Sequence, residues 1–360
     1  MHGGACMIPR HRLLKIHRVC GLAAAVFILL QAITGCMLVY RADLARLIDP
    51  AGMTRHHRAT TAPPSRIVAS LGHAYPKAAM RRLIFARDGT QTHIAHLVDR
   101  AGAAIYVSLD PGDAAILRQG TIWRFPLEAI SQIHFGLMAG MAGLAVVALT
   151  GLSILTLAML GLLYWWPRAG RWRRSLEIRR HRSLGPVLRQ FHRSLGVTAS
   201  ALILISALTG LAMAGELLWQ RAPQTRSGSS LDQPGLGLAV EQALTLAQSG
   251  FPGHRVRDIR MPDGATLNVY FWAPERNARA VHGVSVDLAA MRVTATTPAS
   301  ADASIWVIAL PIHTGEALEK TGRVLALASG LCLAILAISG PLVWLRSRRG
   351  QRVATRSRAS

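Results

Sequence analysis

The sequence predicts an α-helical integral membrane protein: a four-helix transmembrane bundle built from a tandem repeat, with two small α+β domains outside the membrane. Three observations predict this class. The chain of 360 residues is 51% hydrophobic, and its mean hydropathy is +0.29. It contains four apolar runs of at least about 20 residues, the length that crosses a bilayer. Its motifs also recur at a nearly constant spacing in the two halves of the chain.

The four apolar runs divide the chain into spans and connections. We expect spans at 19–41, 134–166, 192–219 and 313–345, external domains at 42–133 and 220–312, a cytoplasmic N-terminus at 1–18, a cytoplasmic loop at 167–191 and a cytoplasmic tail at 346–360. Ile33-Thr34-Gly35-Cys36 resembles a lipoprotein signal, but Thr209-Gly210 stands at the equivalent place in the third run, where no signal could act. We therefore expect the first run to remain as a span.

The net charge of +23 is concentrated beside the apolar runs. The basic residues are Arg10, Arg12, Lys15 and Arg18 before the first run; Arg168, Arg171, Arg173, Arg174, Arg179, Arg180, Arg182 and Arg189 between the second and third; and Arg346, Arg348, Arg349, Arg352, Arg356 and Arg358 after the fourth. Short loops rich in Lys and Arg remain in the cytoplasm. This placement predicts cytoplasmic termini and argues against a nucleic-acid partner, because the charge serves membrane orientation.

Several motifs occur twice. The offset is 175 residues for His17, Gly21, Thr34 and Gly35, which recur as His192, Gly196, Thr209 and Gly210. It is 179 residues for His134, Gly136, Gly151, Gly161 and Trp165, which recur as His313, Gly315, Gly330, Gly340 and Trp344. Each half therefore consists of a span, an external domain and a second span, and both halves have the same orientation, as in a parallel repeat.

The two external segments have the same pattern. Apolar residues at helical spacing predict helices at 65–74 and 238–249. Short β-type stretches follow at 81–87, 92–98 and 104–109, and again at 255–261, 266–272 and 281–287. Asp88-Gly89 and Asp263-Gly264 are typical hairpin turns. Each segment is predicted to form one helix on a sheet of three or four strands, and its thin core predicts that the two domains lean on each other or on the membrane.

Four histidines occupy repeat-equivalent places at the mouths of the apolar runs. His17 and His192 stand at the cytoplasmic ends of the first and third spans, and His134 and His313 at the external ends of the second and fourth. Ionisable residues inside membrane helices usually serve a function, and bundles build ligand sites from facing helices. The pattern predicts two haems, each held by two histidines: His17 with His192, and His134 with His313.

Other interpretations of these residues remain open. A zinc ion usually takes four ligands, with cysteine or acid among them, and neither layer supplies more than two obvious donors. Helix packing without a cofactor is the other alternative. The four cysteines form no CxxCH motif, so a haem here is expected to be b-type. Arg18 and Arg193 follow the cytoplasmic histidines directly and could pair with haem propionates, although anchoring at the cytoplasmic face explains them equally well.

These doubled signatures, over residues 10–348, resemble the PepSY-associated transmembrane helix family, often called iron-regulated membrane proteins. The resemblance implies a bacterial inner-membrane protein with PepSY-like domains in the periplasm. Some members are di-haem reductases of ferric siderophores, and some carry a fused cytoplasmic flavoprotein reductase. Here only a basic tail follows Arg346, so the expected electron donor is a separate cytoplasmic protein or a quinol.

The resemblance implies an electron-transfer protein of the lipid bilayer that reduces a ferric siderophore or another ferric chelate, and thus a possible ferric-chelate reductase. Two other classes remain: a membrane-anchored PepSY module that regulates a protease without redox chemistry, and an iron-chelate permease component. Electron transfer across the membrane depends on the distance between the His17–His192 pair and the His134–His313 pair. His17 and Tyr40 are 23 residues apart, or about 35 Å of helix at about 1.5 Å per residue. Haems at opposite faces are then too far apart for fast direct transfer unless they tilt inward or an intermediate carrier takes part.

Overall fold

The computed structural model describes residues 9–48, 61–87, 91–167, 169–179, 181, 183–220 and 229–356. The predicted turn at Asp88-Gly89 and the arginines at 168, 180, 182 and 358 lie outside these ranges. The chain folds as two units. A helical unit comprises the chain up to Val39, Ser131–Leu218 and the chain from Ile308 onward, and a sheet unit comprises Tyr40–Ile130 and Trp219–Val307.

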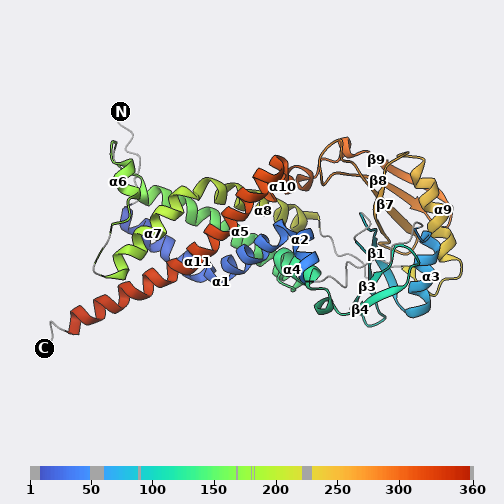
Figure 1. Cartoon of the computed structure of the whole chain (residues 1–360), viewed down its shortest axis with the longest axis horizontal. Coiled ribbons are helices and arrows are strands. Elements are labelled where there is room, and N and C mark those ends of the chain that lie inside the picture. Colours follow the sequence, from blue (N-terminus) through green and yellow to red (C-terminus); the bar gives the residue numbers. More distant parts are fainter. Residues whose placement is uncertain are drawn as a thin grey trace. The chain divides into compact units, whose positions relative to one another are not determined.

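Within the described residues, four helices are long and apolar enough to cross a bilayer. They are α1 (Arg10–Val39), α5 (Gly140–Trp165), α8 (Ser200–Gln220) and α11 (Glu319–Arg356), as labelled in Figure 1. Their outer surfaces are apolar as well: Val26, Leu149 and Leu208 expose 73%, 62% and 60% of their surface. A helix that is hydrophobic on every side belongs in lipid. The chain is therefore a multi-pass membrane protein.

Shorter helices accompany the spans. They are α4 (Pro126–Gly136), α6 (Trp172–Leu176), α7 (Leu184–Thr198), α10 (Ile305–His313) and the 3-10 turn η4 (Glu316–Leu318). The runs that hydropathy presents as continuous at 134–166, 192–219 and 313–345 each contain a helix break. Leu137 and Met138, between α4 and α5, have φ values of 49° and 59°. Hydropathy does not reveal these breaks, because apolar residues continue through them.

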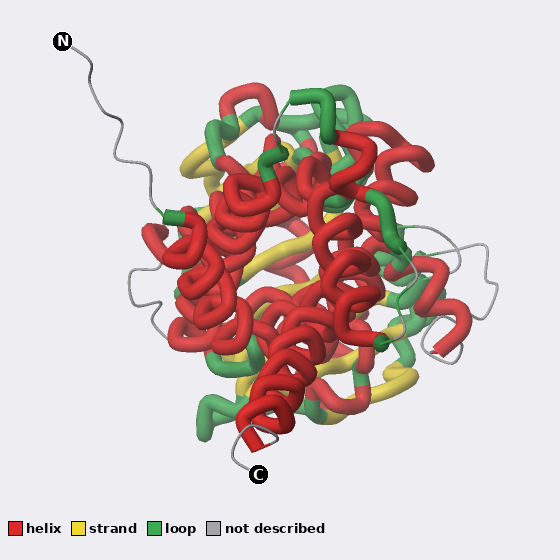
Figure 2. The backbone as a smooth tube through the Cα atoms, turned by 90° about the vertical axis from the view of Figure 1, so that its left-hand side faces the viewer, coloured by secondary structure: helices red, strands yellow, loops and turns green. Residues whose placement is uncertain are grey.

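The spans pack through small residues. Ala24, Ile28, Ile154, Ala199, Ile203 and Ala207 form the buried centre of the bundle. A side chain at Gly151 would meet Leu211 on α8 at 3.4 Å, and one at Gly330 would overlap Cys36 on α1. Figure 2 views the unit along its helices. Without a hydrophobic driving force in lipid, such close backbone approach is what holds membrane helices together.

The described residues of the sheet unit form one antiparallel nine-stranded sheet. Its strands are β1 (Ala79–Ile84), β2 (His93–Val98), β3 (Ala104–Leu109), β4 (Ile116–Gly120), β5 (Ser229–Ser230), β6 (Val256–Arg260), β7 (Thr266–Trp272), β8 (Val281–Asp287) and β9 (Arg292–Thr297). Its helices are α2 (Arg41–Ile48), α3 (Pro64–Ala74) and α9 (Leu236–Gln248), with 3-10 turns η2 (Ile122–Arg124) and η3 (Ala299–Ala301). Six strands coincide closely with the stretches predicted by alternation, and β4 and β9 complete four in each segment.

The two external segments share this sheet, whereas the sequence predicts two separate domains. The order β4-β3-β2-β1-β6-β7-β8-β9 is symmetric about the junction of β1 and β6, where Leu83 pairs with Ile259 and Ile84 with Asp258. We call this junction the seam. An unpaired edge strand is a liability, and a segment of this size has a thin core. Pairing at the seam removes one edge from each half and merges their cores.

Helices α3 and α9 cover one face of the sheet. Their apolar residues share a single core with alternate residues of both strand sets, including Leu71, Val240, Leu83, Val269 and Phe271. The two helices touch closely, because a side chain at Gly237 would meet the carbonyl of Ser65 at 2.9 Å. Strand alternation turns the remaining side chains to the opposite face. That face is polar and carries the arginines discussed below.

Candidate functional site

The structure brings the four predicted histidines together as two pairs within the helical unit. His17 lies on α1 and His192 on α7, with ring centres 6.5 Å apart and an interplanar angle of 85°. His134 lies in the last turn of α4 and His313 ends α10, with ring centres 6.3 Å apart and an angle of 50°. The pairs are those expected from the repeat. Each joins histidines about half the chain apart.

Threonine and backbone groups hold the rings of the His134–His313 pair. Oγ1 of Thr34 lies 3.0 Å from Nδ1 of His134, and Oγ1 of Thr209 lies 3.0 Å from Nδ1 of His313. Nδ1 of His313 is also 3.0 Å from the carbonyl oxygen of Ser206. Because a carbonyl only accepts, Nδ1 of His313 carries the proton.

The same tautomer follows for His134. Thr34 donates its one hydroxyl hydrogen to the carbonyl of Leu30 at 2.7 Å, so its oxygen accepts from Nδ1–H of His134. Thr209 bonds the carbonyl of Ile205 at 2.7 Å in the same way. In both rings Nε2 is then the nitrogen with the free lone pair. A histidine that binds a metal through Nε2 typically donates Nδ1–H to such a partner.

The His17–His192 pair is held less symmetrically. Nδ1 of His192 lies 2.8 Å from Oγ of Ser339, and Ser339 donates to the carbonyl of Leu336 at 3.4 Å. Nδ1 of His17 is buried and turned toward the backbone of Leu157, without a hydrogen bond of ordinary geometry among the described residues. The first half has Leu160 at the place equivalent to Ser339, so no hydroxyl is present there.

A glycine lies against the ring of each histidine. A Cβ atom placed at Gly35 would meet Cε1 of His134 at 3.2 Å, and one at Gly210 would meet Cε1 of His313 at 3.1 Å. The corresponding distances are 3.5 Å from Gly161 to His17 and 3.4 Å from Gly340 to His192. These four glycines belong to the repeated motifs, and only their lack of a side chain lets the rings lie this close to the neighbouring helix.

The ring separations match those of two imidazoles that share one iron. A metal–imidazole bond of about 2 Å, with the ring centre about 1 Å behind the nitrogen, sets the centres of two axial rings roughly 6 Å apart. The observed separations are 6.5 and 6.3 Å. Buried polar nitrogens without a hydrogen-bond partner among the described residues also lie on helices of the bundle: Nε2 of Gln31 on α1 and Nε of Arg193 on α7, which carry paired histidines, and Nε1 of Trp165 on α5. Such atoms suit the polar periphery of a cofactor.

The two arginines that follow His17 and His192 differ. Arg18 is exposed, whereas Arg193 is part-buried, and its buried Nε has no hydrogen-bond partner in the described chain. Arg193 therefore suits a propionate better than Arg18 does. The sequence singled out Thr34 and Thr209 only as parts of the repeat and missed Ser339. The signal for the threonines was present, because each precedes the glycine that contacts the same histidine.

A third group of possible ligands lies in the sheet unit. His254, Glu275 and His282 place their ligand atoms within 4.8 Å of one another, with Nε2 of His282 2.7 Å from Glu275. However, the backbone N–H of Ala299 donates to Nδ1 of His282 at 3.0 Å. A neutral His282 therefore carries its proton on Nε2, which argues against a metal there. His181, in the basic loop before α7, contacts the side chain of Gln190 on α7.

The fold and this arrangement define a multi-pass membrane protein with paired histidines inside a bundle of four spanning helices. The chain belongs to the family described as the PepSY-associated TM region, which matches residues 14–347. The family expected from the sequence is confirmed. No curated protein matches the chain.

Proposed function

We propose that this chain is a b-type di-haem electron-transfer protein of the bacterial inner membrane, which reduces ferric siderophores or other ferric chelates at the periplasmic side. The observation that carries the proposal is the close approach of His17 to His192 and of His134 to His313, with ring centres 6.5 and 6.3 Å apart. Each ring lies against a glycine, and hydrogen bonds to Nδ1 leave Nε2 available in His134 and His313.

The histidines have distinct roles in this proposal. His17 and His192 would hold the cytoplasmic haem, and His134 and His313 would hold the periplasmic haem. A b-type haem held by two histidines would supply one-electron transfer. The threonines orient the rings, the glycines make room beside them, and Arg193 supplies positive charge for a propionate.

The His17–His192 pair and the His134–His313 pair are closer together along α1 than the two ends of the first predicted span are. Thr34, which contacts His134, is 17 residues beyond His17 on α1, a rise of about 26 Å. The sequence estimate of about 35 Å used Tyr40 as the far end. This shorter rise favours electron transfer between groups held at the two histidine pairs over the longer sequence estimate.

The proposed orientation rests on the basic ends of the spans. A guanidinium nitrogen of Arg10 lies 3.0 Å from the carbonyl of Trp166, which places the start of α1 beside the end of α5. The guanidinium of Arg348 stacks 4.4 Å from the ring of Trp344 near the end of α11. Arginines and tryptophans at one end suit a cytoplasmic interface. A separate flavoprotein or quinol would deliver electrons on that side.

Haem content after substitution tests the ligands. Replacement of His192 by alanine should remove about half of the haem and leave the spectrum of the other half intact, and each of the other three single variants should do the same. His181→Ala is the matched control, because His181 lies in the neighbouring basic loop and should be dispensable. Full haem retention in all four ligand variants would refute the assignment.

A second experiment tests the reaction. Dithionite-reduced protein is mixed with ferric siderophores without oxygen, while haem absorption and Fe(II) capture are followed together. Siderophores bind Fe(III), a hard cation, far better than Fe(II), so one-electron reduction releases the metal. We expect haem reoxidation to accompany Fe(II) capture. Haems that stay reduced with every chelate would refute the reductase assignment. Protein without haem would favour the regulatory or permease alternatives.

A further inference from the structure

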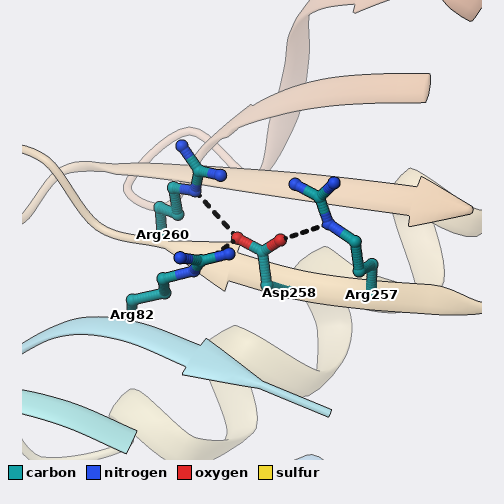
Figure 3. Close-up of polar contacts among 4 residues, drawn as sticks. All are labelled: Arg82, Arg257, Asp258 and Arg260. Atoms are coloured by element: carbon teal, nitrogen blue, oxygen red, sulfur yellow. Dashed lines mark hydrogen bonds and ion pairs between the residues drawn. The ribbon is translucent and has the colours of Figure 1, made fainter. Parts of the chain in front are cut away.

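Three arginines gather around one carboxylate at the seam of the sheet. Asp258 on β6 accepts from Nε of Arg82 at 3.0 Å, of Arg260 at 2.8 Å and of Arg257 at 2.7 Å (Figure 3). Arg82 comes from β1 in the first half of the chain and the other three residues from the second half. We call Arg82, Arg257 and Arg260 the arginine face.

The arginine face carries more positive charge than Asp258 can neutralise. Three guanidinium groups surround one carboxylate, which leaves two net positive charges. Only Arg82 is needed to hold β1 and β6 together through Asp258, because Arg257 and Arg260 lie on the same strand as Asp258. All three arginines bond Asp258 through Nε. Among the described residues, their terminal nitrogens make no further hydrogen bond. Guanidinium groups bind carboxylate and other oxyanions through such paired N–H donors.

Burial and stacking hold these side chains in place. Asp258 is fully buried, whereas Arg82, Arg257 and Arg260 expose 33%, 19% and 42% of their side chains. The guanidinium of Arg260 lies 4.4 Å from the ring centre of Tyr270, and that of Arg257 lies 5.5 Å from Trp272. The donors are therefore pre-positioned and still reachable from solvent, which lowers the entropic cost of binding.

A polar pocket adjoins the arginine face. It has a volume of about 250 Å³ and is lined by Asn268, Tyr270, Val281, Gly283, Val284, Ser285, Thr297 and Asp302. Asn268 pairs with Arg260 across β6 and β7, and Tyr270 belongs both to the pocket and to the stack with Arg260. The surface thus combines excess positive charge, an aromatic ring and neutral hydrogen-bonding groups with one acid, Asp302, whose Oδ1 accepts the backbone N–H of Ser304.

We propose that the arginine face and its adjoining pocket bind anionic ferric chelates, those with catecholate or hydroxycarboxylate oxygens, in preference to neutral hydroxamate chelates. This inference rests on the proposed function and names its substrate class. Three catecholates carry more negative charge than ferric iron neutralises, and the complex is an anion with aromatic rings. Three hydroxamates neutralise the iron. Two uncompensated positive charges beside Tyr270 and Trp272 favour the first kind.

Calorimetric titration of the full chain in lipid nanodiscs tests this choice. The probes are the gallium(III) complexes of a tris-catecholate and of a tris-hydroxamate, because gallium matches ferric iron in charge but is not reduced. We expect Arg260→Gln to weaken catecholate binding about tenfold, the effect of one charge-assisted hydrogen bond. Arg257→Gln should act in the same direction, Arg260→Lys should retain part of the affinity, and hydroxamate binding should stay weak throughout.

The matched control is Arg292→Gln, which removes one exposed arginine from β9, at the far edge of the same sheet half. It should leave both affinities unchanged. Wild-type affinity in both Arg260→Gln and Arg257→Gln, equal binding of the two gallium complexes, or equal affinity for inorganic phosphate would overturn the proposal. Normal gallium-chelate binding without reduction of the ferric form refutes the reductase and leaves the binding face. If the ferric chelate is reduced and neither arginine variant changes that reduction, the binding face is refuted and the reductase assignment stands.

Discussion

Thr34 on α1 places its hydroxyl oxygen 3.0 Å from Nδ1 of His134. The hydroxyl hydrogen is already given to Leu30 at 2.7 Å, so the threonine accepts from the imidazole and sets its tautomer. Thr209 and His313 repeat this relationship at 3.0 Å. In the sheet unit, by contrast, Nδ1 of His93 accepts the backbone N–H of Ala86 at 2.9 Å. Hydrogen-bond direction thus separates the proposed ligands from a structural histidine.

Loss of the Thr34 hydroxyl should weaken binding of the haem proposed at His134 and His313. Thr34→Val keeps the shape of the side chain but leaves Nδ1–H of His134 without its hydroxyl acceptor. Loss of a partner of this kind typically costs about 10–100-fold in metal affinity. Haem retention during titration with a competing apo-haemoprotein measures the effect. Thr156→Val is the control, since Thr156 bonds only the carbonyl of Leu152 on its own helix. Equal losses from both variants would contradict the positioning role.

A side chain at Gly210 should displace His313. Gly210→Leu fills the space where even a Cβ atom would lie 3.1 Å from the imidazole, so the periplasmic haem should be lost while the cytoplasmic one remains. Gly215→Leu on the same helix is the control, because nothing lies within 4 Å of its Cβ position. The haem-to-protein ratio and the reduced absorption spectrum, resolved into the contributions of the two haems, distinguish Gly210→Leu from Gly215→Leu. Two intact haems in Gly210→Leu would exclude the proposed pocket.

Reporter fusions test the orientation. Fusions at Gly112 and Ser230, in the two segments of the sheet unit, should show a periplasmic location, and one at Gly170, in the basic loop, a cytoplasmic one. The physical reason is that the arginines flanking Gly170 resist translocation. Alkaline phosphatase and fluorescent-protein activities measure the two sides. An external Gly170 would invert the topology and with it the assignment of the haems to membrane faces.

Stability should fall with acid because of His96 on β2. Burial lowers the pKa of His96 to about 4, from 6.5, and Arg82 and Arg41 lower it further against the opposing effect of Glu128 and Asp258. The unfolded chain therefore binds the extra proton first, and stability declines as pH falls from about 6.5 toward 4. At pH 5 this single group should cost about 2 kcal/mol relative to pH 7.5.

Thermal unfolding of the full protein at the two pH values measures this effect. His96→Phe keeps a ring beside Tyr106, which lies 4.6 Å away between ring centres, and should show a smaller acid-induced loss than the wild type. His73→Phe is the control because His73 is exposed at the surface. The same acid sensitivity in His96→Phe as in the wild type would show that His96 does not contribute.

Local patterns were enough to predict the spans and most of the strands. Hydrophobic length identifies a membrane helix without tertiary information, because each span satisfies its own backbone hydrogen bonds. Alternation likewise predicts strands with one buried face, such as Thr266–Trp272. The offset of the repeated motifs also indicated which histidines to pair, since equivalent places in two parallel halves face each other across an axis.

Tertiary structure alone decided the remaining features. The seam between β1 and β6 depends on two edges that are far apart in the chain, and no local pattern specifies which edges meet. Ser339 contacts His192 across 147 residues, and Asp258 gathers arginines from both halves. The sequence alone determined which elements form and which residues recur, because these follow from periodicity and composition. Packing determined the hydrogen-bond partners, and through them the tautomers, because these depend on distances between groups remote in sequence.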